Sequence, residues 1–216
     1  NNGYGNQINY GSKLVTTEYF LISNPDITGI DELSINNFLK AARELKNKFS
    51  TLGPRFINAN PKSLKQSIDN NIITEMKFIS GACMFFNKDN FDNLGGFDEN
   101  IFLYFEENDF CLRSFRINKN YQINNIKIYH NVGTSVEVQN EKDRLNQANL
   151  RTWHFIWSKF YYYKKHYGLI LAIIYFLPII IRINFRIILY KLKNDKINYI
   201  KYKTRRSGLY SSILNQ

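Results

Sequence analysis

Three acidic residues within four positions, Glu106, Glu107 and Asp109, carry the clearest chemical signal in the sequence. Carboxylates this close repel one another, which costs folding free energy unless something uses their charge. The aromatic run 102–105 precedes them and predicts a low-dielectric wall, which would raise a carboxyl pKa toward that of a general base. Acids are also favoured in the first turn of a helix by the helix macrodipole. The three residues alone leave both interpretations open.

A second set of residues has the chemistry of a metal site. Asp26 follows the apolar run 18–23 and a proline, and a carboxylate at the carboxyl end of a strand lies where α/β sheets bind ligands. Hard divalent cations commonly bridge such a carboxylate to substrate phosphates. His130 ends a second apolar run, and imidazole is a frequent metal ligand. An Asp after Pro is also a common turn former, and a lone His near a strand end is usually structural.

The first residues are rich in glycine and asparagine, among them Asn2, Gly3 and Asn9. Small and amide residues allow the backbone to approach a ligand closely. Their spacing differs from the GxGxxG pattern of dinucleotide-binding folds. Cys83 and Cys111 are too few for a disulfide framework, and we expect both to be buried thiols.

Strands alternate with helices along residues 1–150, which predicts an α/β fold. Apolar runs indicate strands at 18–23, 49–57, 78–87 and 121–130, the last as one bent strand or a pair. Apolar residues at helical spacing indicate helices at 31–47, 88–94 and 107–117, with helical character also at 12–18. The polar segment 58–76 is expected to be a loop.

Charge divides the chain in two. Of the 29 Lys and Arg residues, 13 lie in residues 151–216 beside a single acid, Asp195, which leaves 16 basic and 17 acidic residues before them. A nearly neutral body therefore precedes a tail of net charge +12. Such asymmetry suggests a polyanion or an anionic membrane surface as partner. Nucleic acid fits poorly, because the aromatic residues of the tail accompany a long aliphatic run and not an Arg/Gly-rich groove.

The tail contains an uncharged run of 14 residues, 168–181, with Pro178 inside it. A membrane-spanning helix needs about 20 apolar residues. Extended to Tyr190 the run is long enough, but it then contains Arg182 and Arg186. An amphipathic helix in the membrane interface fits the basic flanks and aromatic anchors better, and a tilted span with snorkelling arginines is the alternative.

Residues 1–136 contain, in order, the fragments NNGYGNQINYG, YFLISNPDI, FISGACMFF, LGGFDENIFLYFEENDFCLR and YHNVGTSV. Their order and spacing resemble those of family 2 glycosyltransferases, and most closely the rhamnosyltransferase-like branch. The tail, ending RRSGLYSSI, is similar to the C-terminal extension of that branch. The resemblance implies a GT-A fold, a dTDP- or UDP-sugar donor, Mg²⁺ or Mn²⁺, and transfer with inversion at the sugar.

The resemblance also implies a role for each candidate residue. Asp26 would hold the metal ion on the donor diphosphate, with Asn24 in place of the first Asp of the family's DxD-type motif, and His130 would complete the metal site. Glu107 matches the catalytic base, although the family has Asp there, so Glu106 and Asp109 stay as rivals. The donor cleft is implied for Asn2, Gly3, Asn9, Asn24, Gly81 and Ala82, and the acceptor loop would begin at Asp98.

The expected organisation follows from the same resemblance. Residues 1–150 would form a GT-A-type mixed sheet flanked by helices but without the family's first strand–helix unit, so we expect the natural protein to carry an additional N-terminal segment. Residues 151–216 would form a basic, apolar helical tail that associates with an anionic membrane.

The resemblance predicts transfer of a sugar, rhamnose by the branch, to a lipid-linked or polysaccharide acceptor in cell-envelope glycan synthesis. The enzyme would work at the cytoplasmic face of the membrane, either peripherally or through one C-terminal helix. The alternative is a non-catalytic relative that binds the membrane surface.

Overall fold

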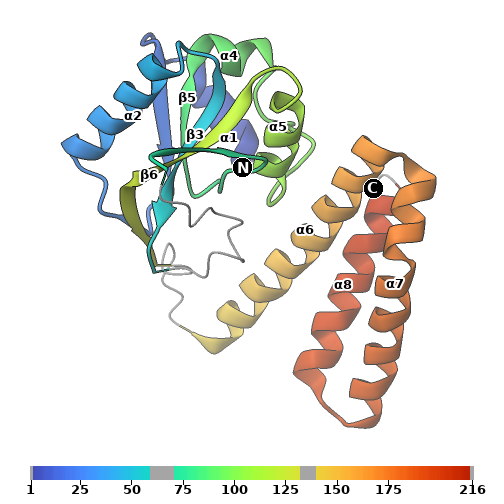
Figure 1. The fold of residues 1–216 in the computed structure, drawn as a ribbon. Coiled ribbons are helices and arrows are strands. Elements are labelled where there is room, and N and C mark those ends of the chain that lie inside the picture. Colours follow the sequence, from blue (N-terminus) through green and yellow to red (C-terminus); the bar gives the residue numbers. More distant parts are fainter. Residues whose placement is uncertain (1, 59–70, 132–139, 215–216) are drawn as a thin grey trace. The chain divides into compact units, whose positions relative to one another are not determined.

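A computed structural model describes the protein over residues 2–58, 71–131 and 140–214. The chain forms two compact units (Figure 1), of which the first comprises Asn1–Asn100 and Glu106–Glu137. The second comprises Ile101–Phe105 and Val138–Gln216. The first unit is α/β, as the alternating pattern predicts; its sheet is mixed, and the second unit is helical.

The α/β unit is built on an open sheet of six described strands in the order β1-β5-β3-β6-β2, with β4 paired to β6. The strands are β1 (Tyr19–Ser23), β2 (Ile27–Thr28), β3 (Phe49–Phe56), β4 (Ile73–Met76), β5 (Cys83–Asn87) and β6 (Lys119–His130). Strands β3 and β6 are parallel, and the other described pairs are antiparallel. The length of β6 lets it pair with β4 along its first half and with β2 at its end.

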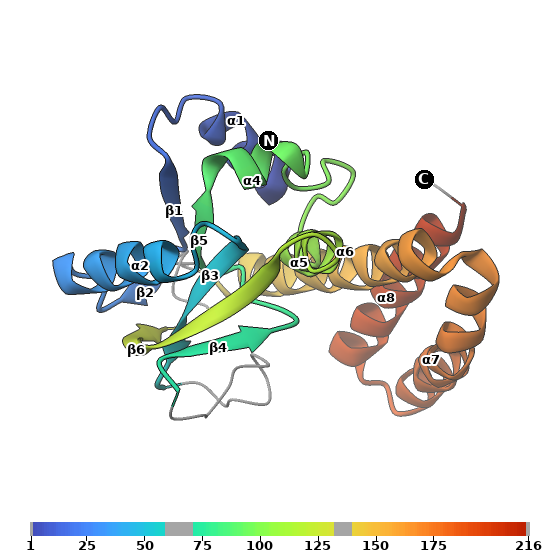
Figure 2. The same cartoon turned by 45° about the horizontal axis from the view of Figure 1, so that its top comes forward.

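Helices cover both faces of this sheet (Figure 2). Side chains alternate between the faces along a strand, so Phe85 and Phe86 of β5 enter two different cores. Phe85 stacks on Phe38 of α2 (Glu32–Glu44), with ring centroids 5.0 Å apart. Phe86 meets Phe91 and Phe110 edge-on, from α4 (Lys88–Asn93) and α5 (Glu106–Ser114). Helix α1 (Tyr4–Ser12) joins the second core through Ile8.

The second unit consists of three helices, α6 (Glu141–Tyr167), α7 (Leu169–Leu192) and α8 (Lys196–Leu214). Gly168 links α6 to α7 with φ 86° and ψ 161°, a conformation essentially confined to glycine. The helices share a core to which α6 contributes Phe160, α7 Phe176 and α8 Leu209. Gly208 brings α8 close to α6, because a Cβ there would lie 2.6 Å from the Trp153 carbonyl oxygen.

The segment Ile101–Phe105 packs on α6 within the helical unit. The Ser158 hydroxyl donates to the Leu103 carbonyl at 2.8 Å, and Phe102 stacks on His154 with centroids 4.5 Å apart. Tyr104 and Phe105 have φ of 68° and 73°, a left-handed conformation that is strained for residues with side chains.

Most expected elements are confirmed within a few residues, and 121–130 is one strand. The helix expected at 12–18 is wrong: α1 begins after Gly3 and ends at Ser12, and the β-branched run 15–17 that follows disfavours helix. The strand expected at 78–87 begins only at Cys83, because a backbone turn from Ser80 precedes it.

Two further expectations concern longer segments. The loop expected at 58–76 contains strand β4, whose four residues pair with β6; residues 59–70 of that loop lie outside the described part of the chain. The boundary expected at residue 150 falls inside α6, which runs without a break from Glu141 to Tyr167. The compact units divide at 137/138 instead.

Replacing Gly208 with Ala is expected to loosen the helical unit, because the new Cβ would overlap the Trp153 carbonyl and lie 2.9 Å from Ile156 Cγ2. Overpacking of this kind costs about 1–3 kcal/mol. Both tryptophans of the chain, Trp153 and Trp157, lie in α6, so urea unfolding followed by tryptophan fluorescence reports on this unit. Gly11→Ala is the matched control, since no atom lies within 4 Å of its Cβ position. Equal midpoints for the two variants would contradict the packing described.

Candidate functional site

The loop after β1 and the end of β6 meet because Ile27 of β2 pairs with His130 of β6. The Asp26 carbonyl accepts the Asn131 N–H at 2.9 Å, and the buried Asp26 carboxylate places Oδ1 3.4 Å from His130 Nε2. Asn58 holds the His130 backbone: its Nδ2 donates to the carbonyl at 3.1 Å, and its Oδ1 accepts the N–H at 2.9 Å. The structure therefore brings Asp26 and His130 together, and adds Asn58, which the sequence analysis missed.

The pair has the spacing of two neighbouring ligands on one cation. With bonds of about 2.1 Å, adjacent octahedral ligands lie about 3 Å apart, close to the 3.4 Å observed. Within residues 2–58, 71–131 and 140–214, no group of three or more His, Cys, Asp or Glu side chains is placed to hold a metal ion. One carboxylate and one imidazole would leave the other positions of a divalent cation to substrate phosphates and water.

Tyr4 ties the first helix to the loop after β1. Its hydroxyl lies 3.0 Å from the Gly81 carbonyl oxygen and 3.3 Å from Asn24 Oδ1, and can donate to either. The Asn24 N–H donates to the Ala82 carbonyl at 2.9 Å. Three segments distant in sequence thus converge on Asn24, Gly81 and Ala82, the residues that the resemblance assigns to the donor cleft. Tyr4 itself was missed, although it stands inside the quoted fragment NNGYGNQINYG.

Glu107 packs against this same backbone. A Cβ at Gly81 would lie 3.3 Å from both Cβ and Cγ of Glu107, so the glycine makes room for the acid. Glu107 is half-buried, and its Oε1 accepts a hydrogen bond from Asn108 at 2.6 Å. Burial raises the pKa of Tyr4 well above its usual range, and the charges of Glu106 and Glu107 add to the shift. The Tyr4 hydroxyl therefore stays protonated, as a donor, near neutral pH.

The other two acids of the cluster are buried. Glu106 lies against α1, with its Cγ 3.5 Å from the Cβ position of Gly5. Asp109 has no exposed surface, and its Oδ2 accepts from Nε of Arg113 at 2.8 Å. The other guanidinium nitrogens of Arg113 donate to two carbonyls of the loop 94–96, each at 2.6 Å. This geometry gives Asp109 a structural role, as the partner of an arginine that the sequence analysis did not single out.

Asn9 also has a structural role. Its Nδ2 donates to the Phe97 carbonyl and its Oδ1 accepts the Phe97 N–H, both at 2.9 Å, so both ends of the amide hold the loop after α4. Gly3 begins α1 with φ 98° and ψ 169°, and Asn2 is exposed before it. Asp98 closes a local turn by accepting the backbone N–H two residues on, at 3.0 Å. Donor binding by Asn2, Gly3 and Asn9 and acceptor binding by Asp98 stay predictions.

The two cysteines are buried, as expected. Burial raises the pKa of Cys83 to about 12, so its thiol is not a nucleophile near neutral pH. The sulfur of Cys111 accepts the Ile79 N–H at 3.4 Å, and the side chain is part of the same core as Phe86.

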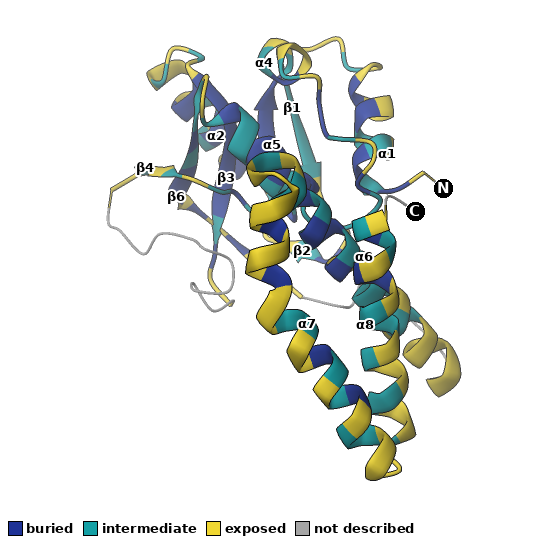
Figure 3. Ribbon diagram, turned by 90° about the vertical axis from the view of Figure 1, so that its right-hand side faces the viewer, coloured by how far each residue is buried: buried dark blue, intermediate teal, exposed yellow. Residues whose placement is uncertain are grey.

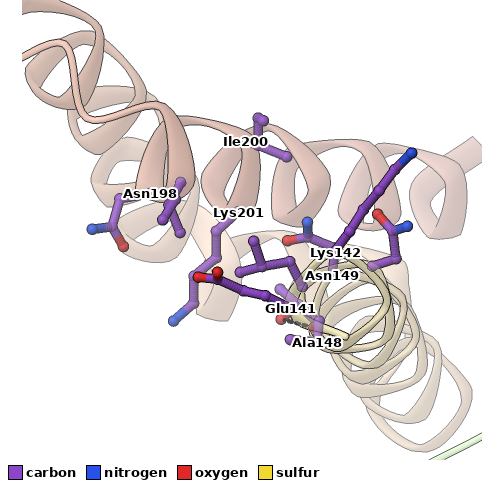
Figure 4. A pocket seen from close by; sticks show the side chains of 11 residues that line it. Glu141, Lys142, Ala148, Asn149, Asn198, Ile200 and Lys201 are labelled. Atoms are coloured by element: carbon purple, nitrogen blue, oxygen red, sulfur yellow. Dashed lines mark hydrogen bonds between the residues drawn. The ribbon is translucent and has the colours of Figure 1, made fainter. Parts of the chain in front are cut away.

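A hollow of about 560 Å³ lies in the helical unit, between the first halves of α6 and α8 (Figure 4). Leu145, Ile197 and Ile200 give it apolar walls, and Lys142 and Lys201 are among its polar residues. None of the predicted site residues lines it. It contains no nucleophile–base pair or acid cluster, so the acids of the α/β unit remain the stronger candidate.

Comparison with known proteins adds no assignment: no model of a known protein family matches this sequence, and no curated protein does either.

Asp109→Ala is expected to destabilise the α/β unit by about 3 kcal/mol, because it leaves the Arg113 guanidinium without its buried carboxylate. Glu107→Gln keeps the shape of a half-buried side chain and is expected to change stability by less than about 0.5 kcal/mol. Chemical denaturation followed by circular dichroism measures both. A stable Asp109→Ala protein would contradict the structural role and return Asp109 to the candidates for the base.

Proposed function

We propose that this chain is a metal-dependent inverting glycosyltransferase of the GT-A type, in which Glu107 is the base. The observation that carries the proposal is a continuous run of contacts between the two acids. Glu107 packs against Gly81, and the next residue, Ala82, accepts the Asn24 N–H. Asn24 belongs to the same loop as Asp26, which pairs with His130. A carboxylate that can accept a proton and a carboxylate that can hold a cation thus belong to one cluster at one end of the sheet.

On the donor side, Asp26 and His130 would hold Mg²⁺ or Mn²⁺ on the diphosphate of a dTDP- or UDP-sugar. When bound, the cation neutralises the charge that builds on the leaving diphosphate. The Tyr4 hydroxyl lies within hydrogen-bond distance of the Gly81 carbonyl and of the Asn24 side chain, and Asn58 keeps His130 in place. Two protein ligands leave the remaining coordination positions to the diphosphate, which makes metal binding depend on donor binding.

On the acceptor side, Glu107 would take the proton of the attacking hydroxyl. The acceptor oxygen forms a bond to the anomeric carbon while the bond from that carbon to the diphosphate breaks, and the configuration inverts. The access of Glu107 supports its choice over the buried Glu106 and the ion-paired Asp109. The family has Asp at this position, so the carboxylate here stands one methylene further from the backbone.

The helical unit supports a membrane location for this reaction. Among the described residues one helix, α7, is long and apolar enough to cross a membrane, and only 22% of its most apolar window is buried. A core helix of a soluble protein would be mostly buried. The resemblance to family 2 glycosyltransferases adds the remaining parts of the proposal, which are the cytoplasmic face of the membrane and a lipid-linked or polysaccharide acceptor for cell-envelope glycan synthesis.

The exposed apolar surface of α7 also suits a second candidate, a non-catalytic module that binds the membrane surface. The two candidates differ in what Glu107 does. An enzyme needs its proton-accepting carboxylate, whereas a binding module tolerates Glu107→Gln without loss.

Asp26→Ala is expected to abolish the Mn²⁺-dependent binding of dTDP or UDP, because it removes the carboxylate that links cation and diphosphate. Calorimetric titration of each nucleotide, with and without Mn²⁺, measures the effect. Asp92→Ala is the matched control, since this aspartate is exposed and pairs with Lys88 on α4. Equal metal-dependent binding by the two variants would remove Asp26 from the site.

Gly81→Ala is expected to lower kcat about tenfold while the protein stays folded, because the new methyl group must displace the Glu107 side chain by a few tenths of an ångström. Glu107→Gln is expected to lower kcat by about 10²–10⁴-fold, the usual contribution of a general base. Release of nucleoside diphosphate from dTDP- and UDP-sugars in the presence of acceptor measures both, with Gly11→Ala as the glycine control. A fully active Glu107→Gln protein would favour the binding module.

A further inference from the structure

One stripe of α7 is apolar along the whole helix and lies outside the core that the described helices of this unit share. Its residues recur every three or four positions and are each 53–78% exposed: Ile170, Ile174, Leu177, Ile181, Phe185, Ile188 and Leu192. Positions at this spacing share one face of a helix. In Figure 3 the ribbon of α7 carries exposed bands along its whole length, between bands of buried and intermediate residues. The 22 residue steps from Ile170 to Leu192 extend about 33 Å at 1.5 Å per residue.

The opposite face of α7 is covered by α6 and α8. Phe160 of α6 meets Phe176 edge-on at 5.0 Å, and Tyr202 of α8 lies 5.5 Å from Tyr190, both measured between ring centroids. The contacts lie along the helix and not at one end of it. Any position that α7 takes in a membrane therefore brings its two neighbours with it.

Those neighbours place charged groups beside the middle of α7. Lys159 Nζ lies 5.3 Å from the centroid of the Tyr175 ring, and an Arg206 nitrogen lies 3.5 Å from Asn184 Oδ1. Arg182 and Arg186 of α7 itself belong to the same central stretch. If α7 crossed the bilayer, these cations would lie within the hydrocarbon, where charged side chains are costly. A helix that lies along the surface keeps them at the level of the lipid headgroups.

The charge of the unit matches an anionic surface. Residues 151–216 contain 13 Lys and Arg residues and the single acid Asp195. An apolar helix face bordered by basic residues is the combination that binds the interface of a membrane containing anionic lipids. A second copy of this chain, equally basic, would repel such a surface and is the less suitable occupant of the stripe.

We propose that α7 lies parallel to the surface of an anionic lipid bilayer, with the stripe Ile170–Leu192 inserted and α6 and α8 on its aqueous side, and does not cross the membrane. The proposal rests on the membrane association proposed above but not on sugar transfer. It adds structural grounds for the interfacial helix, which the sequence favoured over a tilted span.

Fluorescent labels along the stripe test this arrangement in the full chain. Ile170→Cys, Ile181→Cys and Leu192→Cys each receive an environment-sensitive NBD label and are mixed with vesicles of phosphatidylcholine and phosphatidylglycerol. We expect all three labels to shift to the blue equally and all three to be bleached by dithionite added outside the vesicles. Cys83 and Cys111 are fully buried, so the unsubstituted chain, treated with the same reagent, controls for background labelling.

Other outcomes overturn the proposal. A label at either end that is protected from external dithionite, with the Ile181→Cys label deepest, means that α7 spans the bilayer. Labels that do not shift mean that lipid does not cover the stripe, and a dimer seen by light scattering would then identify a second copy as its occupant.

A charge placed on the stripe gives an independent measurement. Ile174→Glu with Ile181→Glu is expected to weaken sedimentation with anionic vesicles by about tenfold or more. Ile117→Glu, at an even more exposed apolar position in the α/β unit, is expected to leave it unchanged. Equal binding by the two proteins would overturn the insertion of the stripe. Vesicle insertion without any transfer activity would refute the proposed enzyme and leave this inference intact.

Discussion

The buried ion pair between Asp109 and Arg113 is the interaction on which the candidate site depends. Within one turn of α5, Arg113 neutralises Asp109 and its remaining donors take up carbonyls of the loop after α4. Asn9 of α1 holds the next residue of that loop, Phe97. Three helices are thereby fixed to one loop, and the first turn of α5, which carries Glu107, is set against Gly81. Glu107 can keep a defined position although it is half-exposed, because Asp109 on the same helix turn is held by Arg113.

The sequence predicted the parts of the fold that depend on local patterns. Helices α2 and α4 were found from apolar residues at helical spacing. Strand β4 was missed because its four residues have no apolar pattern, and only pairing with β6 makes them a strand. The same difference separates the site residues. The acids were found from their spacing, whereas Tyr4 and Asn58 act through partners between 20 and 77 positions away, which local spacing does not reveal. Arg113 stands four residues after Asp109, a helical spacing that could have identified this pair, but its bonds to the loop 94–96 reach 17 and 19 positions back.

The two units differ in the kinds of residues and contacts that they contain. The α/β unit contains the buried polar networks and the acids, and its core is dense in stacked phenylalanines. The helical unit has few acids, many cations and one helix whose outward face is wholly apolar. Its internal contacts are made with small residues where helices approach closely, such as Gly208 and Ser212, whose hydroxyl donates to the Trp157 carbonyl at 2.9 Å. Each unit therefore has its own core and its own hydrogen bonds, so the acids of the α/β unit and the apolar face of the helical unit can change independently.

The parallel pairing of β3 with β6 also constrains how the chain folds. Phe49 pairs with Lys119, 70 residues later, whereas α6, α7 and α8 contact their neighbours through short connections. Contacts that close long loops form slowly, and contacts between successive helices form fast. During synthesis the sheet cannot be completed until β6 has left the ribosome. The apolar helix α7 begins about 40 residues after β6, which corresponds to about 2–8 s of synthesis. Mixed α/β domains fold within about a second, so the α/β unit can close before that apolar surface emerges.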